Sequence, residues 1–341
     1  MKKVLFATTA LVLSAGFASA EVSLSGDGRM GVVYNGDDWN FSSRARVTFT
    51  LSGQTDGGLE FGGSFRADQA GDSVSNNGAA YGSEGSVYIS GAFGKIEMGD
   101  TVSAPEALFG DLPEVGYEDL TAGEGDYVGF AGLNGQGLLE NDIPYLTGDS
   151  GATTGPNNPL LLYTYSAGAF SVAASLSDGK WAMGDNAYSA TVDDAQEYAI
   201  AAAYTFQNYT VGLGYEVVDL PTGTTLFGDD KLSQVELAGV ANFGNTSVKA
   251  YYAAGDDGNP VDQAYGLGVS SVFGATTVMG YVQKVEFTDA ATTALGLDGA
   301  TWWGLGASYD LGGGASVAGG ISDSDLDGSN VTADLGVKFK F

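Results

Sequence analysis

The feature that most constrains the fold is a two-residue alternation of apolar and polar side chains, which returns in short segments along most of the chain. Alternation with this period places the apolar side chains on one face of a β-strand, whereas an amphipathic helix repeats every 3.6 residues. The clearest segments lie near 194–206, 208–218, 300–311 and 330–341. The sequence therefore predicts an all-β protein.

Sixteen segments of this kind can be placed, near 22–34, 39–52, 59–66, 87–93, 95–99, 159–166, 169–177, 194–206, 208–218, 232–243, 246–254, 262–273, 276–287, 300–311, 314–323 and 330–341. Minimal turns such as Gln207-Asn208 alternate with longer connections such as 178–193 and 288–299. Short turns on one rim and long loops on the other are typical of outer-membrane barrels, which have an even number of strands. We therefore expect a 16-stranded antiparallel transmembrane β-barrel.

A soluble barrel or sandwich would show the same local alternation, with its apolar face turned inward. Three observations favour the membrane. The apolar band is about ten residues per strand, the length that a tilted strand needs to cross a bilayer. Aromatic residues gather near strand ends, and sixteen strands make a ring too wide for side chains to fill.

The composition excludes several classes of function. The chain has no Cys and no His, so Ser-His-Asp and Cys-His catalysis and histidine metal sites are absent. A formal net charge of −29 argues against nucleic acid, because phosphate contacts need Lys and Arg. We expect a protein that is not an enzyme and requires no cofactor.

The first twenty residues have the pattern of a signal peptide. Lys2 and Lys3 precede an apolar run from Val4 to Phe17, and Ala18-Ser19-Ala20 fits a cleavage site. We expect residues 1–20 to be removed and residues 21–341 to form the barrel in the outer membrane of a bacterium.

One long stretch, about 100–158, has neither strand alternation nor a helical period. It has no Lys, Arg or His and holds eleven carboxylates: Asp100, Glu106, Asp111, Glu114, Glu118, Asp119, Glu124, Asp126, Glu140, Asp142 and Asp149. Irregular segments of this length inside a compact domain are usually functional or disordered. We expect a loop that folds into the barrel.

Arginine placement gives the second clue to function. After the first twenty residues the chain has four arginines, all in the first three expected strands and all on the polar face: Arg29, Arg44, Arg46 and Arg66. Neighbouring strands lie about 4.8 Å apart, so the four should form one basic wall. Facing lipid would cost roughly 2–4 kcal/mol for each arginine, which favours the lumen. The alternative is that they pair with Glu60, Asp27 or Asp68 and only stabilise the wall.

Four stretches resemble a known family: Glu21 to Gly63, Gly91 to Tyr117, Asn141 to Asp149 (NDIPYLTGD) and Asp334 to Phe341 (DLGVKFKF). They are similar to the general-diffusion porins of photosynthetic α-proteobacteria, the Rhodobacter-type porins. The resemblance implies a sixteen-stranded barrel, a homotrimer, and a third long loop folded inward as an eyelet. The chain departs from the family pattern mainly within that loop, from Leu120 to Glu140.

The loop carboxylates in the matching part are the candidates for the pore constriction: Glu106, Asp111 and Glu114, with Glu118 and Asp119 behind them. Crowded carboxylates repel one another unless a cation lies among them, and Ca²⁺ accepts six to eight oxygen ligands. The resemblance also implies calcium near this loop. We expect a structural Ca²⁺ at Glu106, Asp111, Glu114 and Asp119.

The expected function is passive diffusion of ions and small hydrophilic solutes through a water-filled channel. Its selectivity would be set by the arginine wall and the loop carboxylates, and its other partners would be outer-membrane lipid and lipopolysaccharide. One alternative is a solute-specific channel with a saturable site. Another is an exported Ca²⁺-binding β-structural protein, although the nine-residue repeat typical of such proteins is not seen.

Overall fold

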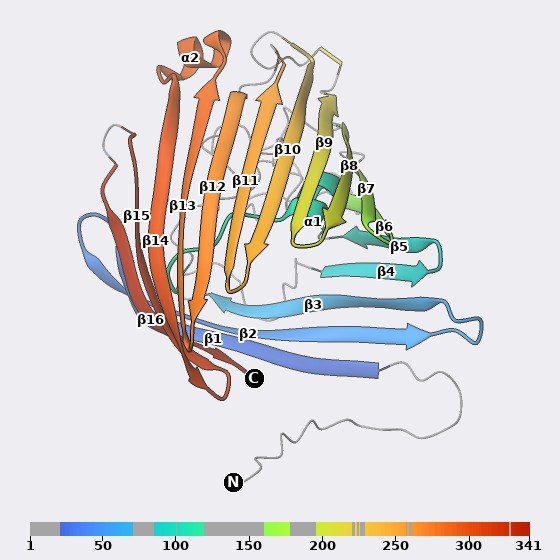
Figure 1. Cartoon of the computed structure of the whole chain (residues 1–341), viewed down its shortest axis with the longest axis horizontal. Helices are drawn as coiled ribbons and strands as arrows, with labels where there is room; N and C mark the ends of the chain where they lie inside the picture. The colour runs from blue at the N-terminus through green and yellow to red at the C-terminus, as the bar shows by residue number, and fades with distance from the viewer. Residues whose placement is uncertain are drawn as a thin grey trace.

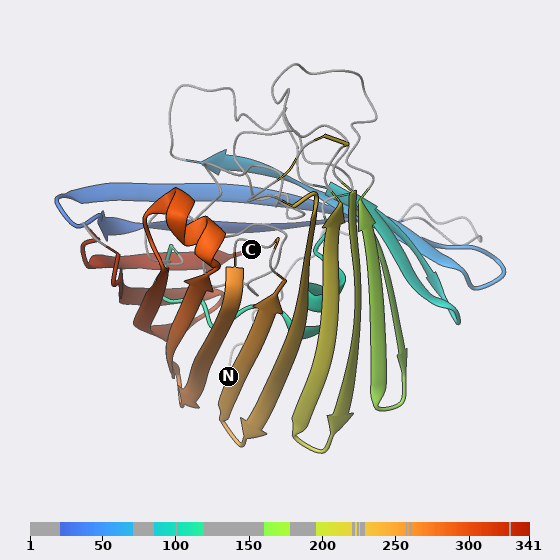
Figure 2. The ribbon, with the colours of Figure 1, turned by 90° about the horizontal axis from the view of Figure 1, so that it is seen from above.

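The computed structural model describes residues 21–70, 85–99, 101–118, 160–177, 196–219, 222–223, 225, 229–256, 258, 261–326 and 329–341. Residues 1–20, the expected signal peptide, and residues 119–159 of the long irregular stretch lie outside these ranges. The expectations for both therefore stay predictions. The described residues form one closed barrel of sixteen strands, in which each strand pairs with its chain neighbours and β1 pairs with β16 (Figures 1 and 2). All pairs are antiparallel, as the alternation predicts.

The strands agree with the predicted segments to within a few residues. Their bounds are β1 Glu21–Tyr34, β2 Trp39–Gln54, β3 Glu60–Ala70, β4 Gly85–Gly91, β5 Gly94–Gly99, β6 Leu160–Ala167, β7 Phe170–Ser177, β8 Gln196–Phe206, β9 Tyr209–Asp219, β10 Lys231–Phe243, β11 Thr246–Gly255, β12 Val261–Phe273, β13 Thr276–Phe287, β14 Gly299–Gly312, β15 Ala315–Ser324 and β16 Thr332–Lys340.

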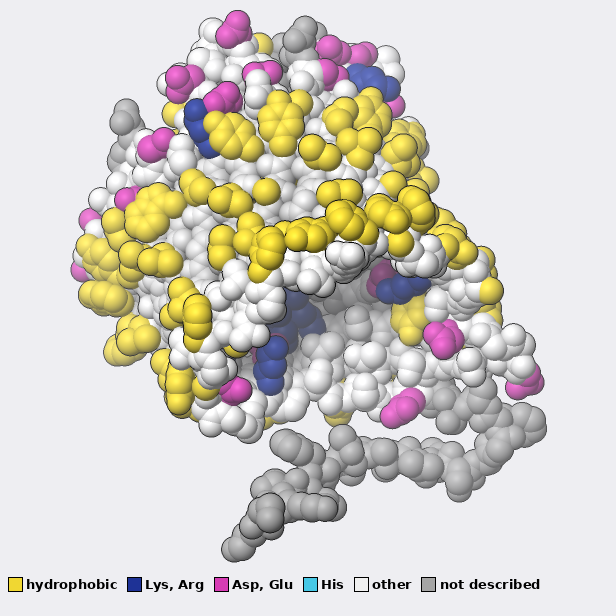
Figure 3. All heavy atoms as spheres, in the orientation of Figure 1, with side chains coloured by type: hydrophobic (Ala, Val, Ile, Leu, Met, Phe, Trp, Pro, Cys, Tyr) yellow, Lys and Arg dark blue, Asp and Glu magenta, His cyan; other side chains and the backbone are white. Residues whose placement is uncertain are grey.

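The alternation sorts side chains between the two faces of the wall. On β9, Leu213 and Tyr215 are exposed on the outer face, whereas Glu216 between Tyr215 and Val217 is fully buried on the inner face. Figure 3 shows hydrophobic side chains spread over the outer wall, and a hollow whose interior carries Lys and Arg. An apolar outer surface around a polar interior is the arrangement that a lipid bilayer requires of a barrel.

Aromatic rings gather beside the short turns. The centroids of Phe170 and Tyr204 lie 4.6 Å apart, those of Phe206 and Tyr209 lie 5.3 Å apart, and Phe243 lies 6.0 Å from Tyr209. These residues belong to four neighbouring strands, β7 to β10. They form part of the aromatic girdle that barrels place at a membrane interface.

Two short helices were not expected from the sequence: α1 (Ala104–Phe109) and α2 (Asp289–Leu295). The second lies in the predicted loop 288–299, where Thr288 accepts a hydrogen bond from Ala291 N and Gly296 ends the helix with a left-handed φ of 71°. No helix among the described residues is long and apolar enough to cross a bilayer.

Candidate functional site

Residues 101–118, called the inner segment below, run along the inner face of the barrel (Figure 1). At its start, Ala104 N donates to Ser175 Oγ of β7 at 3.0 Å. Midway, Lys249 Nζ of β11 donates to the carbonyl oxygen of Asp111. At its end, Tyr117 N donates to the Asp334 carboxylate of β16 at 2.7 Å. The segment therefore follows the wall from β7 to β16.

Glycines on the inner face make room for the segment. A Cβ atom at Gly306 of β14 would lie 2.9 Å from Val115 Cγ1, and one at Gly336 of β16 would lie 2.7 Å from Tyr117 Cδ2. Both distances are shorter than ordinary carbon contacts of about 3.5–4.0 Å. Further glycines meet the segment in the same way: Gly212 and Gly214 on β9, Gly266 and Gly268 on β12, and Gly320 on β15. The high glycine content of these strands thus forms a groove for the segment.

The four predicted arginines do lie together on the inner face. Arg29 of β1 stands opposite Arg44 of β2, while Arg46 stands opposite Asp27. On β3, Arg66 stands opposite Thr48 of β2. The adjacent residues in these strands, including the strongly exposed Met30, point outward.

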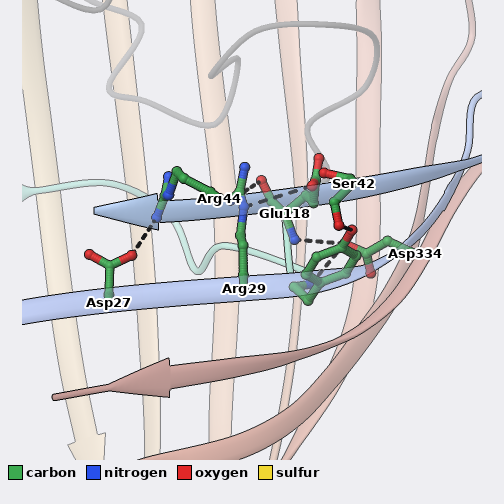
Figure 4. A network of polar contacts seen from close by, with 7 residues as sticks. Asp27, Arg29, Ser42, Arg44, Glu118 and Asp334 are labelled. Carbon is green, nitrogen blue, oxygen red and sulfur yellow. Dashed lines mark hydrogen bonds and ion pairs between the residues drawn. The ribbon is translucent and has the colours of Figure 1, made fainter. Parts of the chain in front are cut away.

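Figure 4 shows the ion pairs of Arg44 and Arg29. Arg44 Nη2 donates to Asp27 Oδ1 at 3.0 Å, a contact within the wall. Arg29 meets the inner segment: its Nε lies 3.7 Å from Glu118 Oε1, and its Nη1 donates to the Glu118 carbonyl at 3.3 Å. The expected alternative, pairing within the wall, thus describes Arg44, whereas Arg29 contacts a predicted loop carboxylate.

Sequence reasoning missed two members of this basic wall. Closure of the barrel sets Lys338 of β16 opposite Arg29, and Lys340 opposite Asp27. Their neighbour Val337 pairs with Met30 on the outer face, so the two lysines face inward. The alternation in the last strand carries this signal, because Val337, Phe339 and Phe341 share the apolar face. We call the full set the basic wall: Arg29, Arg44, Arg46, Arg66, Lys338 and Lys340.

The predicted carboxylates are spread along the inner segment. Glu106 lies on α1, Asp111 and Glu114 are exposed, and Glu118 is at the basic wall, while Asp119 is outside the described residues. Within the described ranges, no group of three or more Asp, Glu, His or Cys residues is placed to hold a metal ion. Glu106, Asp111 and Glu114 therefore do not by themselves fit the six to eight oxygens that Ca²⁺ takes.

A further set of acidic side chains is buried beneath α1. Glu216 of β9 and Glu236 of β10 are fully buried, and Gln234 Nε2 donates to Glu216 Oε2 at 3.2 Å and also to Glu236 Oε1. A Cβ at Gly214, which pairs with Glu236, would lie 2.9 Å from Pro105 of the helix. The alternation predicts these carboxylates on the lumen face, but it does not reveal that they are buried there.

Tyr117 is buried where the segment reaches β16 and β1. Burial raises the pKa of its phenol to about 12. The hydroxyl is therefore protonated at neutral pH, and it donates to the Ser42 carbonyl of β2 at 3.5 Å. This contact adds a second polar link between the segment and the wall that carries the arginines.

Comparisons with known proteins agree with this architecture. Residues 7–329 match a family described as Gram-negative porin. A protein named porin from Rhodobacter capsulatus is 56% identical over 339 residues, covering 94% of this chain and all of its own. A solved porin structure shares 55% identity over 94% of this chain and 100% of its own, with a TM-score of 0.73. A triple mutant of a Rhodopseudomonas blastica porin, 22% identical with the same coverage, has a TM-score of 0.61, which supports the fold alone.

Proposed function

Since this chain belongs to the Gram-negative porin family, we propose that it passes ions and small hydrophilic solutes by diffusion, with ion preference set by the basic wall and the inner-segment carboxylates. Porins are outer-membrane channels, so the chain is a channel protein and not an enzyme. The proposed ion preference depends on how charged groups are arranged in its lumen. It rests on one observation, the distribution of opposite charges around the inner face.

The ring order supports the idea of two opposed charges. The basic wall occupies β16, β1, β2 and β3. The inner segment starts against β7 to β9, and β9 lies eight strands from β1 in a ring of sixteen. Glu106 on α1 is therefore on the far side of the lumen from Arg29, with Asp111 and Glu114 between them along the segment.

Charges placed in this way act on anything that crosses the lumen. The carboxylates attract cations, and the basic wall attracts anions. Rings or walls of charge tune the ion preference of channels in this way. Ordered water between the two sides favours polar solutes, because an apolar solute would have to displace it. The screening length at physiological salt is about 8 Å, so the effect is confined to solutes that pass close to these groups.

The proposal also covers the oligomeric state of the barrel, its surrounding lipid and a bound cation. We infer that three copies associate and that outer-membrane lipid surrounds the exposed aliphatic face. A structural Ca²⁺ at the segment would require further oxygen ligands, such as Asp119, beyond those that the structure describes. These statements rest on membership of the family and on the chemistry of carboxylates.

Removal of wall charge tests the proposal. Arg44→Ala combined with Arg46→Ala should raise cation preference, read as the reversal potential across a planar bilayer in a KCl gradient. The matched control removes two outward-facing bases, Lys231→Ala with Lys284→Ala, which pair with Asp219 and Glu286 on the lipid side. If the wall variant and the control both keep the wild-type reversal potential, the proposed role of the wall is rejected.

A further inference from the structure

The end of the inner segment is held by one carboxylate of the barrel wall, that of Asp334 on β16 (Figure 4). Its Oδ2 accepts hydrogen bonds from Tyr117 N at 2.7 Å and from Glu118 N at 2.8 Å. Its Oδ1 accepts from Gly320 N of β15 at 2.8 Å. The side chain is 5% exposed, so these three donors take the place of water around a buried charge.

The segment is shaped for this contact. Gly116 has a φ of 91°, and a Cβ on it would lie 2.5 Å from both oxygens of the Asp334 carboxylate. A side chain at residue 116 would therefore be strained in its backbone and would also collide with the anchor. Successive backbone N–H groups that converge on one anion form a nest, and here the anion belongs to the protein.

The contact fixes a charged group of the candidate constriction. Glu118, whose N–H is held by Asp334, is the carboxylate that meets Arg29 at 3.7 Å. We propose that Asp334 is a positioning residue for ion selectivity, which holds the inner segment on the wall and so sets Glu118 against Arg29. This inference rests on the proposed function, because it assumes that the inner segment shapes the conducting path.

Loss of the anchor has a defined consequence. Without the carboxylate, Tyr117 N and Glu118 N are left buried or partly buried without their acceptor, and a buried donor without a partner destabilises the arrangement. The segment can recover those hydrogen bonds by leaving the wall for water. Its end would then fluctuate within the lumen, and the Arg29 contact would open.

The experiment breaks the contact from either side. Asp334→Ala removes the acceptor, and Gly116→Ala places a methyl group against it without changing any strand. Asp334→Asn keeps one acceptor oxygen and should behave between wild type and Asp334→Ala. The control, Glu60→Gln, removes one carboxylate charge from the inner face of β3, where Glu60 contacts Ser90 of β4.

Two measurements distinguish the anchoring of the segment from the effect of that anchoring on permeation. The chain has no cysteine, so Glu114→Cys, at an exposed position of the segment, gives a unique site for a nitroxide label. Its electron paramagnetic resonance line shape reports the motion of the segment, independently of any current. Single-channel recordings of the unlabelled variants, which keep Glu114, report open-channel noise and reversal potential.

We expect Asp334→Ala and Gly116→Ala to mobilise the label, to replace the steady open level by a noisy one, and to shift the reversal potential, while Glu60→Gln leaves the label unchanged. A label that stays immobile in either variant overturns the anchoring role. A label that becomes mobile while both electrical readouts stay at wild type overturns the proposed function of the segment, and with it the positioning role. If Asp334→Ala does not assemble, Gly116→Ala alone decides between these results.

Discussion

The groove of inner-face glycines makes a steric prediction at Gly212 of β9, which faces Phe109 at the end of α1. A Cβ at Gly212 would lie 2.5 Å from Phe109 Cζ and 3.0 Å from Cδ1. Ordinary carbon contacts are about 3.5–4.0 Å, and Phe109 Cε1 would lie closer to this Cβ than Cζ does, so Gly212→Ala requires the ring to move by about 1.5–2 Å. Because the barrel wall is a continuous hydrogen-bonded sheet, we expect α1 to move toward the lumen rather than the strand to move outward.

The energy can be bounded. Overpacking of this size costs about 1–3 kcal/mol, while replacing glycine by alanine returns about 0.4–1 kcal/mol through the unfolded chain. A net loss of about 1.3 kcal/mol in the free energy of unfolding is expected, within a range of about 0–2.6 kcal/mol. It can be measured by denaturation of the barrel in detergent, and single-channel conductance should fall because the helix narrows the path.

A matched control lies on the next strand. Gly239 of β10 pairs with Val211 beside Gly212, but it faces outward, and the nearest atom to a Cβ there is Thr210 O at 3.9 Å. Gly239→Ala should therefore keep wild-type conductance and at least wild-type stability. Phe109→Leu should restore part of the conductance lost in Gly212→Ala. If Gly212→Ala matches Gly239→Ala in both measurements, the packing of α1 against β9 is refuted.

Two further predictions concern charge. Lys338→Gln with Lys340→Gln should raise cation preference in the KCl gradient, because both lysines belong to the basic wall. Lys231→Gln, on the outer face of β10, is the control. An equal shift of the reversal potential in the control would show that the lumen position is irrelevant. Added Ca²⁺ should raise the denaturation temperature of the wild-type protein in detergent if carboxylates of the long segment bind it, and isothermal titration with Ca²⁺ should then give saturable heat. No saturable heat would count against the calcium proposal.

The sequence predicts the barrel well because its signal is local. Alternation decides which face of a strand meets lipid, and it places Arg29 and Arg44 on the inner face without knowledge of their partners. The same rule applied to β16 places Lys338 and Lys340 in the lumen, because Val337, Phe339 and Phe341 share the apolar face. The caps of α2, Thr288 and Gly296, were also readable.

The path of the inner segment is not local information. Tyr117 and Asp334 are 217 residues apart, and nothing in the sequence around either residue predicts that they meet. In the sequence, inner-face glycines such as Gly306 look like ordinary small residues of a strand. Their packing role becomes clear only when the inner segment lies against them. The buried Glu216 likewise looks like any lumen carboxylate, because the alternation in β9 shows which face it lies on and not whether it is exposed.

If two opposed groups of charge set ion preference, removal of each group should shift the reversal potential in its own direction. The wall variant is Arg44→Ala with Arg46→Ala, and the segment variant is Glu106→Gln with Glu114→Gln. In the same KCl gradient, the reversal potential should move toward cation preference in the wall variant and toward anion preference in the segment variant. The protein with all four substitutions should lie between them. Shifts of the same sign, or no shift in either variant, would show that these charges do not set ion preference.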